Sequence, residues 1–202
     1  MINILIKESD SLFQYGLTSF FNEFFVHEDQ RIDFNFSYTS ESVKMADIIV
    51  LSLCPGESFI CFPELLKRKG GIVIGFIDDE MRVSAQSSCF QDIIFISRRA
   101  PVTQVRAVLH AAWQRTQREG YRQSSVSCFD CQQQTLTPQQ IRIMIGLYKG
   151  RSIMQIADEL MISDKTVFAH KYIAMRKFNL RSDYELILLV NKMIEREICK
   201  IF

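Results

Sequence analysis

The sequence has no hydrophobic run long enough to cross a membrane. Its longest apolar stretch, around Ile48–Cys54, is far shorter than the roughly 18 residues that a membrane helix needs. The N-terminal segment Met1–Lys7 has no basic leader and no cleavage site, so it is predicted to be a first β-strand rather than a signal peptide. We therefore expect a cytoplasmic protein without a membrane partner.

The sequence also lacks the motifs of common enzymes. It contains no glycine-rich phosphate loop, and Ser52 is not flanked by the glycines of a nucleophile elbow. His27 and His110 have no acid–base partner close by in the sequence. We therefore predict that the chain is not an enzyme and has no cofactor.

The six cysteines do not form a metal-binding pattern. Only Cys128 and Cys131 lie close together in the sequence. A structural zinc site needs two further ligands at a fitting spacing, which His110, His170 and Cys199 do not supply. Free thiols in a reducing compartment are the simplest interpretation, with a redox switch at the close pair as the alternative.

The charge is distributed unevenly between the two halves of the chain. Residues 132–202 carry 11 Lys and Arg against 7 Asp and Glu, a net charge of +4, and residues 1–131 carry 13 against 16, a net charge of −3, which agrees with the overall +1. The basic C-terminal half fits nucleic-acid binding. A Gln- and Ser-rich stretch separates the halves, so we predict domains at residues 1–116 and 135–202 with a linker at 117–134.

The N-terminal half alternates short aliphatic runs with helical patterns. Predicted strands are Ile2–Ile6, Ile32–Phe36, Asp47–Leu53, Gly71–Ile77 and Ile93–Ser97. Predicted helices include Leu12–Phe25, Phe62–Lys69 and Val102–Trp113. This alternation predicts an α/β doubly wound domain with a five-stranded parallel sheet.

Residues 151–180 have the pattern of two helices joined by a tight turn. Ser152 and Gln155 form a capping-box pair, and Ser163 caps a second helix that runs from Asp164 to about Phe178. The apolar residues of the first helix fall on one face: Ile153, Ile156, Ala157 and Leu160. We therefore predict an all-α, four-helix domain of the helix-turn-helix type, in which the second helix of the motif enters the DNA major groove.

The second helix has two faces. Val167, Ala174 and Phe178 recur at the spacing of a buried stripe. The opposite face presents a cationic and aromatic row: Lys165, Phe168, Ala169, Tyr172 and Arg176. This row suits phosphate attraction and apolar contact with thymine methyl groups, whereas the alternative is an ordinary solvated helix.

The segment Leu136–Phe178 resembles the DNA-binding domain of the LuxR/FixJ (NarL) type of transcriptional regulator. The resemblance lies in Leu136-Thr137-Pro138, Gly150, Ile156-Ala157, Ser163, Lys165-Thr166-Val167, His170 and Arg176-Lys177. It implies that Phe168, Ala169 and Tyr172 enter the major groove. It also implies DNA contacts from Lys165, Thr166, His170, Lys171, Arg176 and Lys177. Gln140 and Asn179 stand where the family usually has Glu and often has Gly, and Phe168 and Tyr172 replace polar or basic readers.

The N-terminal half resembles the receiver domain of the same class of regulator. The resemblance lies in Leu12-Phe13-x-x-Gly16-Leu17, Ala46–Leu51, Pro55-Gly56 and Phe95-Ile96 followed by Ala100-Pro101. The phosphorylation pocket implied by this resemblance is degenerate. Its positions hold Glu8, Ser9 and Asp10 for the acidic pair, Ser52 for the acceptor, Gly75 for the hydroxyl and Arg98 for the lysine.

This pocket lacks the groups that phosphoryl transfer to a receiver requires. A serine at the acceptor position cannot form an acyl phosphate, a missing carboxylate weakens the Mg²⁺ site, and glycine cannot sense a phosphoryl group. Asp47 would be the acceptor only in a shifted register, but it lies at the start of its strand, whereas ligands collect at the carboxyl ends. We therefore predict a pseudo-receiver that is not phosphorylated.

The resemblance implies double-stranded DNA and a second regulator subunit as partners. The chain is similar to auxiliary regulators of capsule synthesis, so it is expected to act as a homodimer or as a heterodimer with a LuxR/FixJ-type response regulator. The last predicted helix, Asp183–Ile198, is apolar enough either for dimerisation or for an ordinary core. Two further functions stay open: a ligand-responsive regulator with a pocket at Ser9, Ser52 and Gly75, and an antagonist that binds another regulator.

Overall fold

The computed structural model describes residues 1–26, 30–78, 88–90, 92–117 and 134–196. Within it the chain divides into two compact units, Met1–Leu53 with Cys61–Cys131, and Cys54–Ile60 with Gln132–Phe202. Residues 118–133 of the predicted linker lie outside the described residues, as do Cys128, Cys131 and Cys199. Among the described residues, none of the helices combines the length and the apolar character that crossing a membrane requires.

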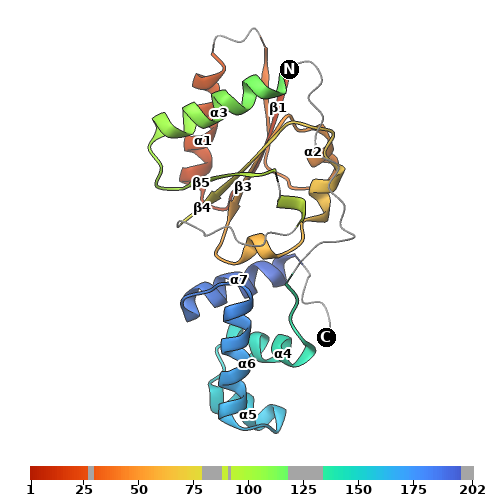
Figure 1. The fold of residues 1–202 in the computed structure, drawn as a ribbon, viewed down its shortest axis with the longest axis vertical. Coiled ribbons are helices and arrows are strands. Elements are labelled where there is room, and N and C mark those ends of the chain that lie inside the picture. The colour runs from red at the N-terminus through yellow and green to blue at the C-terminus, as the bar shows by residue number, and fades with distance from the viewer. Residues whose placement is uncertain (27–29, 79–87, 91, 118–133, 197–202) are drawn as a thin grey trace. The chain divides into compact units, whose positions relative to one another are not determined.

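The first unit is built on a parallel five-stranded sheet, as the sequence predicts (Figure 1). Its strands are β1 (Ile2–Lys7), β2 (Ile32–Asn35), β3 (Ile48–Leu53), β4 (Ile72–Ile77) and β5 (Ile94–Ser97), in the order β2-β1-β3-β4-β5. The three central strands are aliphatic on both faces, because helices or turns cover each side of the sheet.

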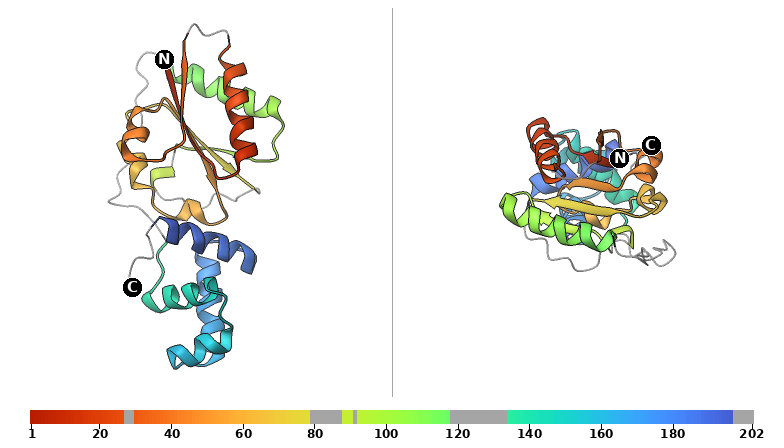
Figure 2. Two further views of the ribbon diagram at one scale, coloured as in Figure 1. Left: turned by 180° about the vertical axis from the view of Figure 1, so that it is seen from behind. Right: turned by 90° about the horizontal axis from the view of Figure 1, so that it is seen from above.

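Helices α1 (Ser11–Phe24) and α3 (Val102–Thr116) cover one face of this sheet (Figure 2). The other face is covered by α2 (Ser40–Met45) and the 3₁₀ helices η2 (Pro63–Lys67) and η3 (Ser88–Phe90). Helix α2 escapes the sequence prediction because it is only six residues long. The helix predicted at Phe62–Lys69 is a 3₁₀ helix.

The second unit is helical, as predicted. It contains α4 (Pro138–Tyr148), α5 (Ile153–Leu160), α6 (Asp164–Lys177) and α7 (Asp183–Glu195), together with the 3₁₀ helix η1 (Glu57–Phe59). Helices α4 and α5 approach closely at Gly146, where an added Cβ would lie 2.9 Å from Ile156 Cγ1. Their core includes Ile143, Ile156, Val167 and Phe178.

Two left-handed residues set the ends of the helices in this unit. Met161, with φ 52°, ends α5 and turns the chain toward α6. Asn179, with φ 54°, follows α6. Asparagine tolerates this conformation better than most residues other than glycine, so Asn179 meets the same backbone demand as the glycine often found there in similar sequences.

Candidate nucleic-acid interface

Side-chain caps define the starts of both α5 and α6. The Ser152 hydroxyl accepts a hydrogen bond from the Gln155 amide at 3.2 Å, and Gln155 Oε1 accepts one from the Ser152 amide at 2.8 Å. Ser163 Oγ accepts from the Thr166 amide at 3.2 Å and lies 2.9 Å from Thr166 Oγ1. These bonds satisfy helix-end amides and set the direction in which α6 leaves the turn.

Helix α6 packs through the stripe predicted from its spacing. Val167 and Ala174 are fully buried, and Phe178 is 1% exposed. Burial of this stripe determines which side of the helix remains available to a ligand, because residues three and four apart share one face.

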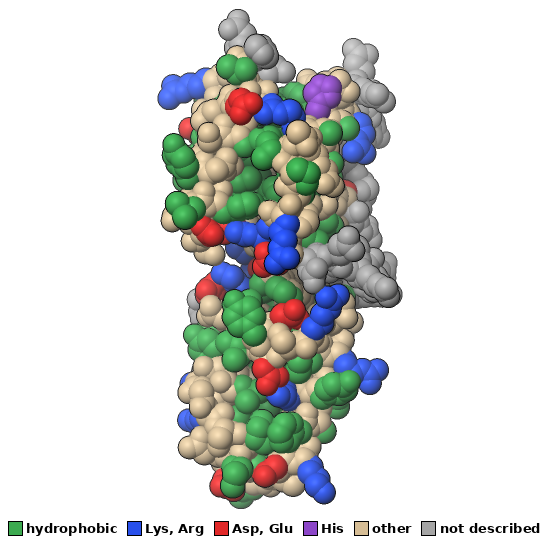
Figure 3. Space-filling model, turned by 90° about the vertical axis from the view of Figure 1, so that its left-hand side faces the viewer, with side chains coloured by type: hydrophobic (Ala, Val, Ile, Leu, Met, Phe, Trp, Pro, Cys, Tyr) green, Lys and Arg blue, Asp and Glu red, His purple; other side chains and the backbone are tan. Residues whose placement is uncertain are grey.

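The opposite face of α6 is exposed and largely apolar at its centre. Phe168 is 52% exposed and Tyr172 is 63% exposed, and Ala169 between them is also exposed. A shallow groove runs beside them, lined by Lys165, Phe168, Ala169, Lys171, Tyr172, Met175 and Asp183. On the face of the C-terminal unit that Figure 3 shows, hydrophobic side chains are exposed between scattered charges rather than beneath a continuous basic layer.

The basic residues predicted on α6 fall into two groups. Lys165 and Arg176 are exposed to solvent. By contrast, Lys171 Nζ donates to both carboxylate oxygens of Asp183 at 2.9 Å, and its side chain is 15% exposed. Lys177 Nζ donates to the Thr135 carbonyl oxygen at 2.9 Å. Two of the four cations are therefore engaged within the protein.

Lys177 and His170 have surroundings that the sequence does not reveal. Lys177 Nζ also donates to Gln140 Oε1 at 3.1 Å, and this same oxygen accepts the Thr137 amide in the capping box of α4. His170 is half-buried, and its Nδ1 has no hydrogen-bond partner among the described residues. Both residues thus face the protein more than Lys165 does.

The predicted phosphorylation pocket is occupied by an internal hydrogen-bond network. Arg98 Nη1 donates to Glu8 Oε2 at 2.7 Å, and the Ser52 hydroxyl donates to the same oxygen. The Arg98 guanidinium also lies 3.8 Å from an Asp10 carboxylate oxygen and 4.1 Å above the Phe13 ring. The residues assigned as remnants of the acidic pair, the acceptor and the lysine therefore meet at the carboxyl edge of the sheet.

The structure corrects the place of Gly75 in this pocket. Gly75 pairs with Leu51, and Phe76 pairs with Ser52. Because side chains alternate between faces along a strand, Gly75 faces away from Ser52, and its missing side chain would meet Phe95. Phe76 therefore occupies the position beside Ser52. The error arose because the sequence alone does not determine register to one residue.

Two other candidate residues, Ser9 and Asp47, take no part in the Glu8–Ser52–Arg98 hydrogen bonds. Ser9 is exposed. Asp47, the alternative acceptor, lies at the start of β3, where its carboxylate accepts hydrogen bonds from the Asn3 amide at 2.8 Å and from Asn3 Nδ2 at 3.2 Å. In the described part of the chain, no cluster of three His, Cys, Asp or Glu residues could hold a metal ion.

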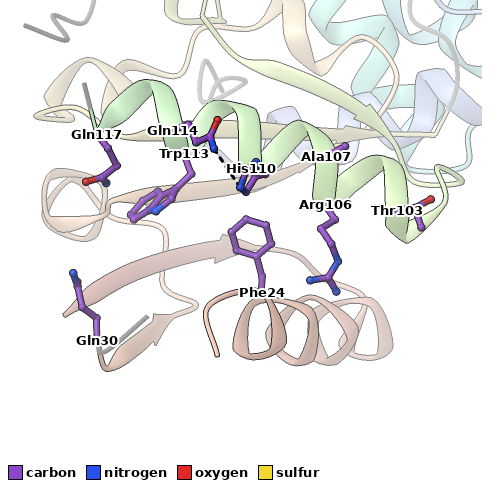
Figure 4. Close-up of a pocket in the computed structure, with 9 residues that line it drawn as sticks. All are labelled: Phe24, Gln30, Thr103, Arg106, Ala107, His110, Trp113, Gln114 and Gln117. Atoms are coloured by element: carbon purple, nitrogen blue, oxygen red, sulfur yellow. Dashed lines mark hydrogen bonds between the residues drawn. The ribbon is translucent and has the colours of Figure 1, made fainter. Parts of the chain in front are cut away.

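The structure has a hollow of about 790 Å³ between α1 and α3 that the sequence analysis did not predict (Figure 4). Its lining comprises Phe24, Gln30, Thr103, Arg106, Ala107, His110, Trp113, Gln114 and Gln117. Arg106 is paired with Glu23 at 2.6 Å, and His110 Nε2 lies 3.4 Å from Gln114 Nε2. Periodicity predicts the buried face of α3, but it cannot show that its outer residues border a hollow.

The C-terminal unit matches a known family. Residues 134–190 match the family described as "Bacterial regulatory proteins, luxR family". The match spans α4, α5 and α6 and most of α7, so it contains both capped helix starts and the whole exposed face of α6.

Longer similarities extend over most of the chain. The oxygen regulatory protein NreC of Staphylococcus epidermidis is 26% identical over 161 residues, which cover 79% of this chain and 69% of that protein. Among solved structures, RcsB of Salmonella enterica serovar Typhimurium bound to promoter P1flhDC has a TM-score of 0.54 at 18% identity, covering 92% of this chain and 96% of that one.

A structure of two RcsB dimers bound to two parallel DNAs has a TM-score of 0.51 at 17% identity, covering 94% of this chain and 98% of that one. At these identities the likeness concerns the fold: a parallel five-stranded sheet with helices, followed by a helix-turn-helix domain.

Proposed function

We propose that this chain, which carries a luxR-family DNA-binding domain at residues 134–190, regulates transcription as a homodimer and without phosphorylation of its N-terminal domain. The proposed organisation is a pseudo-receiver at residues 1–116, a linker at 117–134 and the DNA-binding domain at 135–202. Because its binding partner would be the bacterial chromosome, we place the protein in the cytoplasm.

The observation that carries DNA binding is the exposed face of α6 within the family-matched segment. The buried stripe and the two caps present Lys165, Phe168, Tyr172 and Arg176 together on the outer side of the second helix of a helix-turn-helix. In this motif that side lies in the major groove. Lys165 and Arg176 would contact phosphates, and the aromatic pair would contact base edges.

Independence from phosphorylation is supported by the chemistry of the Glu8–Ser52–Arg98 network. An acyl phosphate requires a carboxylate nucleophile, and a serine hydroxyl occupies that position. The Arg98 guanidinium already neutralises Glu8, whose side chain is 2% exposed, so this carboxylate is not free to recruit Mg²⁺. In the absence of phosphorylation, activity would be controlled by the amount of the protein or by a partner protein.

Self-association is supported by apolar surface on α7. Leu186, Leu189, Val190 and Met193 belong to the core, which agrees with the ordinary-core interpretation of this helix. The next face carries Tyr184, 71% exposed, and Ile187, 44% exposed. Tyr148, 41% exposed, reaches Asn191 of the same face through its hydroxyl at 3.4 Å. A second copy would bury this surface, and two half-sites on DNA would match such a pair.

A heterodimer with a LuxR/FixJ-type response regulator is the second arrangement. The observation that favours it is the low charge at the centre of the α6 face, since a subunit with weak electrostatic attraction for DNA gains from a more basic partner. The same α7 surface would then contact the partner instead of a second copy.

The test is selection of binding sequences from random duplex DNA with the full chain, followed by electrophoretic mobility shift. We expect a selected sequence with two related half-sites and a shift that acetyl phosphate with Mg²⁺ does not strengthen. Phosphate incorporation at Ser52 or at any aspartate would refute the proposal that the N-terminal domain is not phosphorylated. Binding that requires a co-purified response regulator from the native host would favour the heterodimer, and failure to bind any DNA in either form would favour an antagonist. Thermal-shift screening against small metabolites tests the ligand-responsive alternative.

A further inference from the structure

The centre of the exposed α6 face is apolar for two reasons. Apolar side chains form it, and the lysine beside it is paired with an aspartate. Phe168, Ala169 and Tyr172 form the exposed row, and Met175 continues the groove at its inner side. Among the side chains of these four residues, the Tyr172 hydroxyl is the one group that forms strong hydrogen bonds. Such a surface cannot make the bidentate hydrogen bonds with which Arg selects guanine and Asn or Gln selects adenine.

One cation beside this row is neutralised by an aspartate of α7. Lys171 donates to both oxygens of Asp183 at 2.9 Å, and its ammonium group lies 5.5 Å from the centre of the Phe168 ring. With 15% of its side chain exposed, Lys171 is held against the protein rather than extended toward a ligand. Asp183 therefore neutralises the positive charge that lies beside Phe168 and holds the Lys171 side chain against the protein.

Exposed cations remain at the two ends of the same face. Lys165 and Arg176 are both exposed, and neither has an ion-pair partner within the described ranges. Eleven residues of α-helix separate them by about 16 Å along the axis, compared with a major groove about 12 Å wide. This arrangement is complementary to the groove, with phosphates toward its walls and base edges at its floor.

On this basis we infer that α6 selects A·T base pairs through apolar contact of Phe168 and Tyr172 with the C5-methyl groups of thymine, and that Asp183 is a positioning residue that holds Lys171 out of this contact. The inference rests on the proposed DNA-binding function and specifies how bases are read. Thymine is the one base that presents an apolar group in the major groove, so it is the base that matches this surface.

The test uses the selected duplex with each thymine replaced singly by deoxyuridine, which removes the methyl group and leaves the hydrogen-bonding edge unchanged. We expect about a three- to tenfold loss of affinity at one or two positions of each half-site, the order expected for one buried methyl group. Replacement of such a T·A pair by C·G should weaken binding, and 5-methylcytosine at that position should restore part of the loss.

Alanine variants of α6 show which side chains contact the thymine methyl group. In Phe168→Ala or Tyr172→Ala, the deoxyuridine penalty at the contacted position should disappear, because the double change removes only one interaction. Tyr15→Ala, which changes an exposed tyrosine on α1, is the matched control and should keep the full penalty. Intact binding with no deoxyuridine sensitivity at any position would overturn the inference and leave the proposed function standing. Absence of binding to every duplex would overturn both.

Asp183→Asn tests the positioning role. Release of Lys171 should make the dependence of log Kd on log salt steeper by about one unit, as expected for one added phosphate contact, and should bring selected and random DNA closer in affinity. Glu195→Gln, which removes another lysine partner on α7, is the control and should change neither quantity. An unchanged salt dependence in correctly folded Asp183→Asn would show that Asp183 does not withhold Lys171 from DNA.

Discussion

Arg98 and Glu8 form an ion pair at 2.7 Å across the carboxyl edge of the parallel sheet, and Ser52 donates to the same Glu8 oxygen. Glu8 follows β1, Ser52 lies in β3 and Arg98 follows β5, so one carboxylate connects three strands. The position that the sequence predicts for receiver phosphorylation is thus part of the internal hydrogen bonding of the first unit.

Placing a carboxylate at Ser52 is expected to destabilise the first unit. Ser52→Asp would put a second negative charge against the buried Glu8 carboxylate and remove the hydroxyl donor. Ser52→Asn is the matched control, because it has similar size and no charge. We expect the aspartate variant to be less stable than the asparagine variant by ~1–3 kcal/mol at neutral pH. The single tryptophan, Trp113, lies in α3, so urea unfolding followed by its fluorescence reports this unit. Equal stability of the two variants would contradict the importance of the ion pair.

Lys165→Ala is expected to weaken binding to selected and random duplexes by the same factor. Its exposed ammonium group is predicted to contact a phosphate, which carries no sequence information. The slope of log Kd against log salt should become shallower by about one unit. Lys192→Ala on α7 is the control and should leave both quantities unchanged. A loss confined to selected DNA would instead assign Lys165 to base reading.

Ile187→Asp is expected to shift the protein toward monomer in sedimentation velocity. A charge in the Tyr184–Ile187 surface would have to be desolvated in a dimer. Met154→Asp is the control, because Met154 is an exposed apolar residue on α5, with 67% of its surface accessible. Circular dichroism should show the same helix content in both variants. If both variants sediment like the unmodified chain, α7 does not form the dimer interface.

Asn179 is expected to tolerate glycine but not alanine. Its φ of 54° is left-handed, where an alanine side chain costs roughly 1 kcal/mol or more and asparagine costs less. Asn179→Ala should lower the stability of the helical unit, and Asn179→Gly should keep or raise it. The unfolding transition is followed by circular dichroism and separated from the transition that Trp113 fluorescence detects. A stable alanine variant would show that the turn after α6 rearranges easily.

The periodic features of the sequence were sufficient for most of the fold. Aliphatic runs predicted all five strands, and the capping serines predicted the starts of α5 and α6. The buried stripe Val167, Ala174 and Phe178 was also correct, because burial follows directly from helical spacing. Helix α2 was missed, since six residues give too little periodicity for detection.

Only part of the candidate site could be predicted from the sequence. Spacing along α6 placed Lys165, Phe168, Tyr172 and Arg176 on one exposed face. It did not show that Asp183, on another helix, engages Lys171, or that Lys177 reaches the Thr135 carbonyl oxygen. These contacts join residues 12 and 42 positions apart, so no local pattern records them.

What the sequence determined by itself is local: which residues form helices and strands, and which side of each is apolar, because side-chain period and helix capping act over a few residues. What the tertiary structure decided is which charges remain available. It placed Phe76 rather than Gly75 beside Ser52, and it paired Arg98 with Glu8 and Lys171 with Asp183. The physical reason is that charge neutralisation depends on distances of a few ångströms between elements, which only their packing sets.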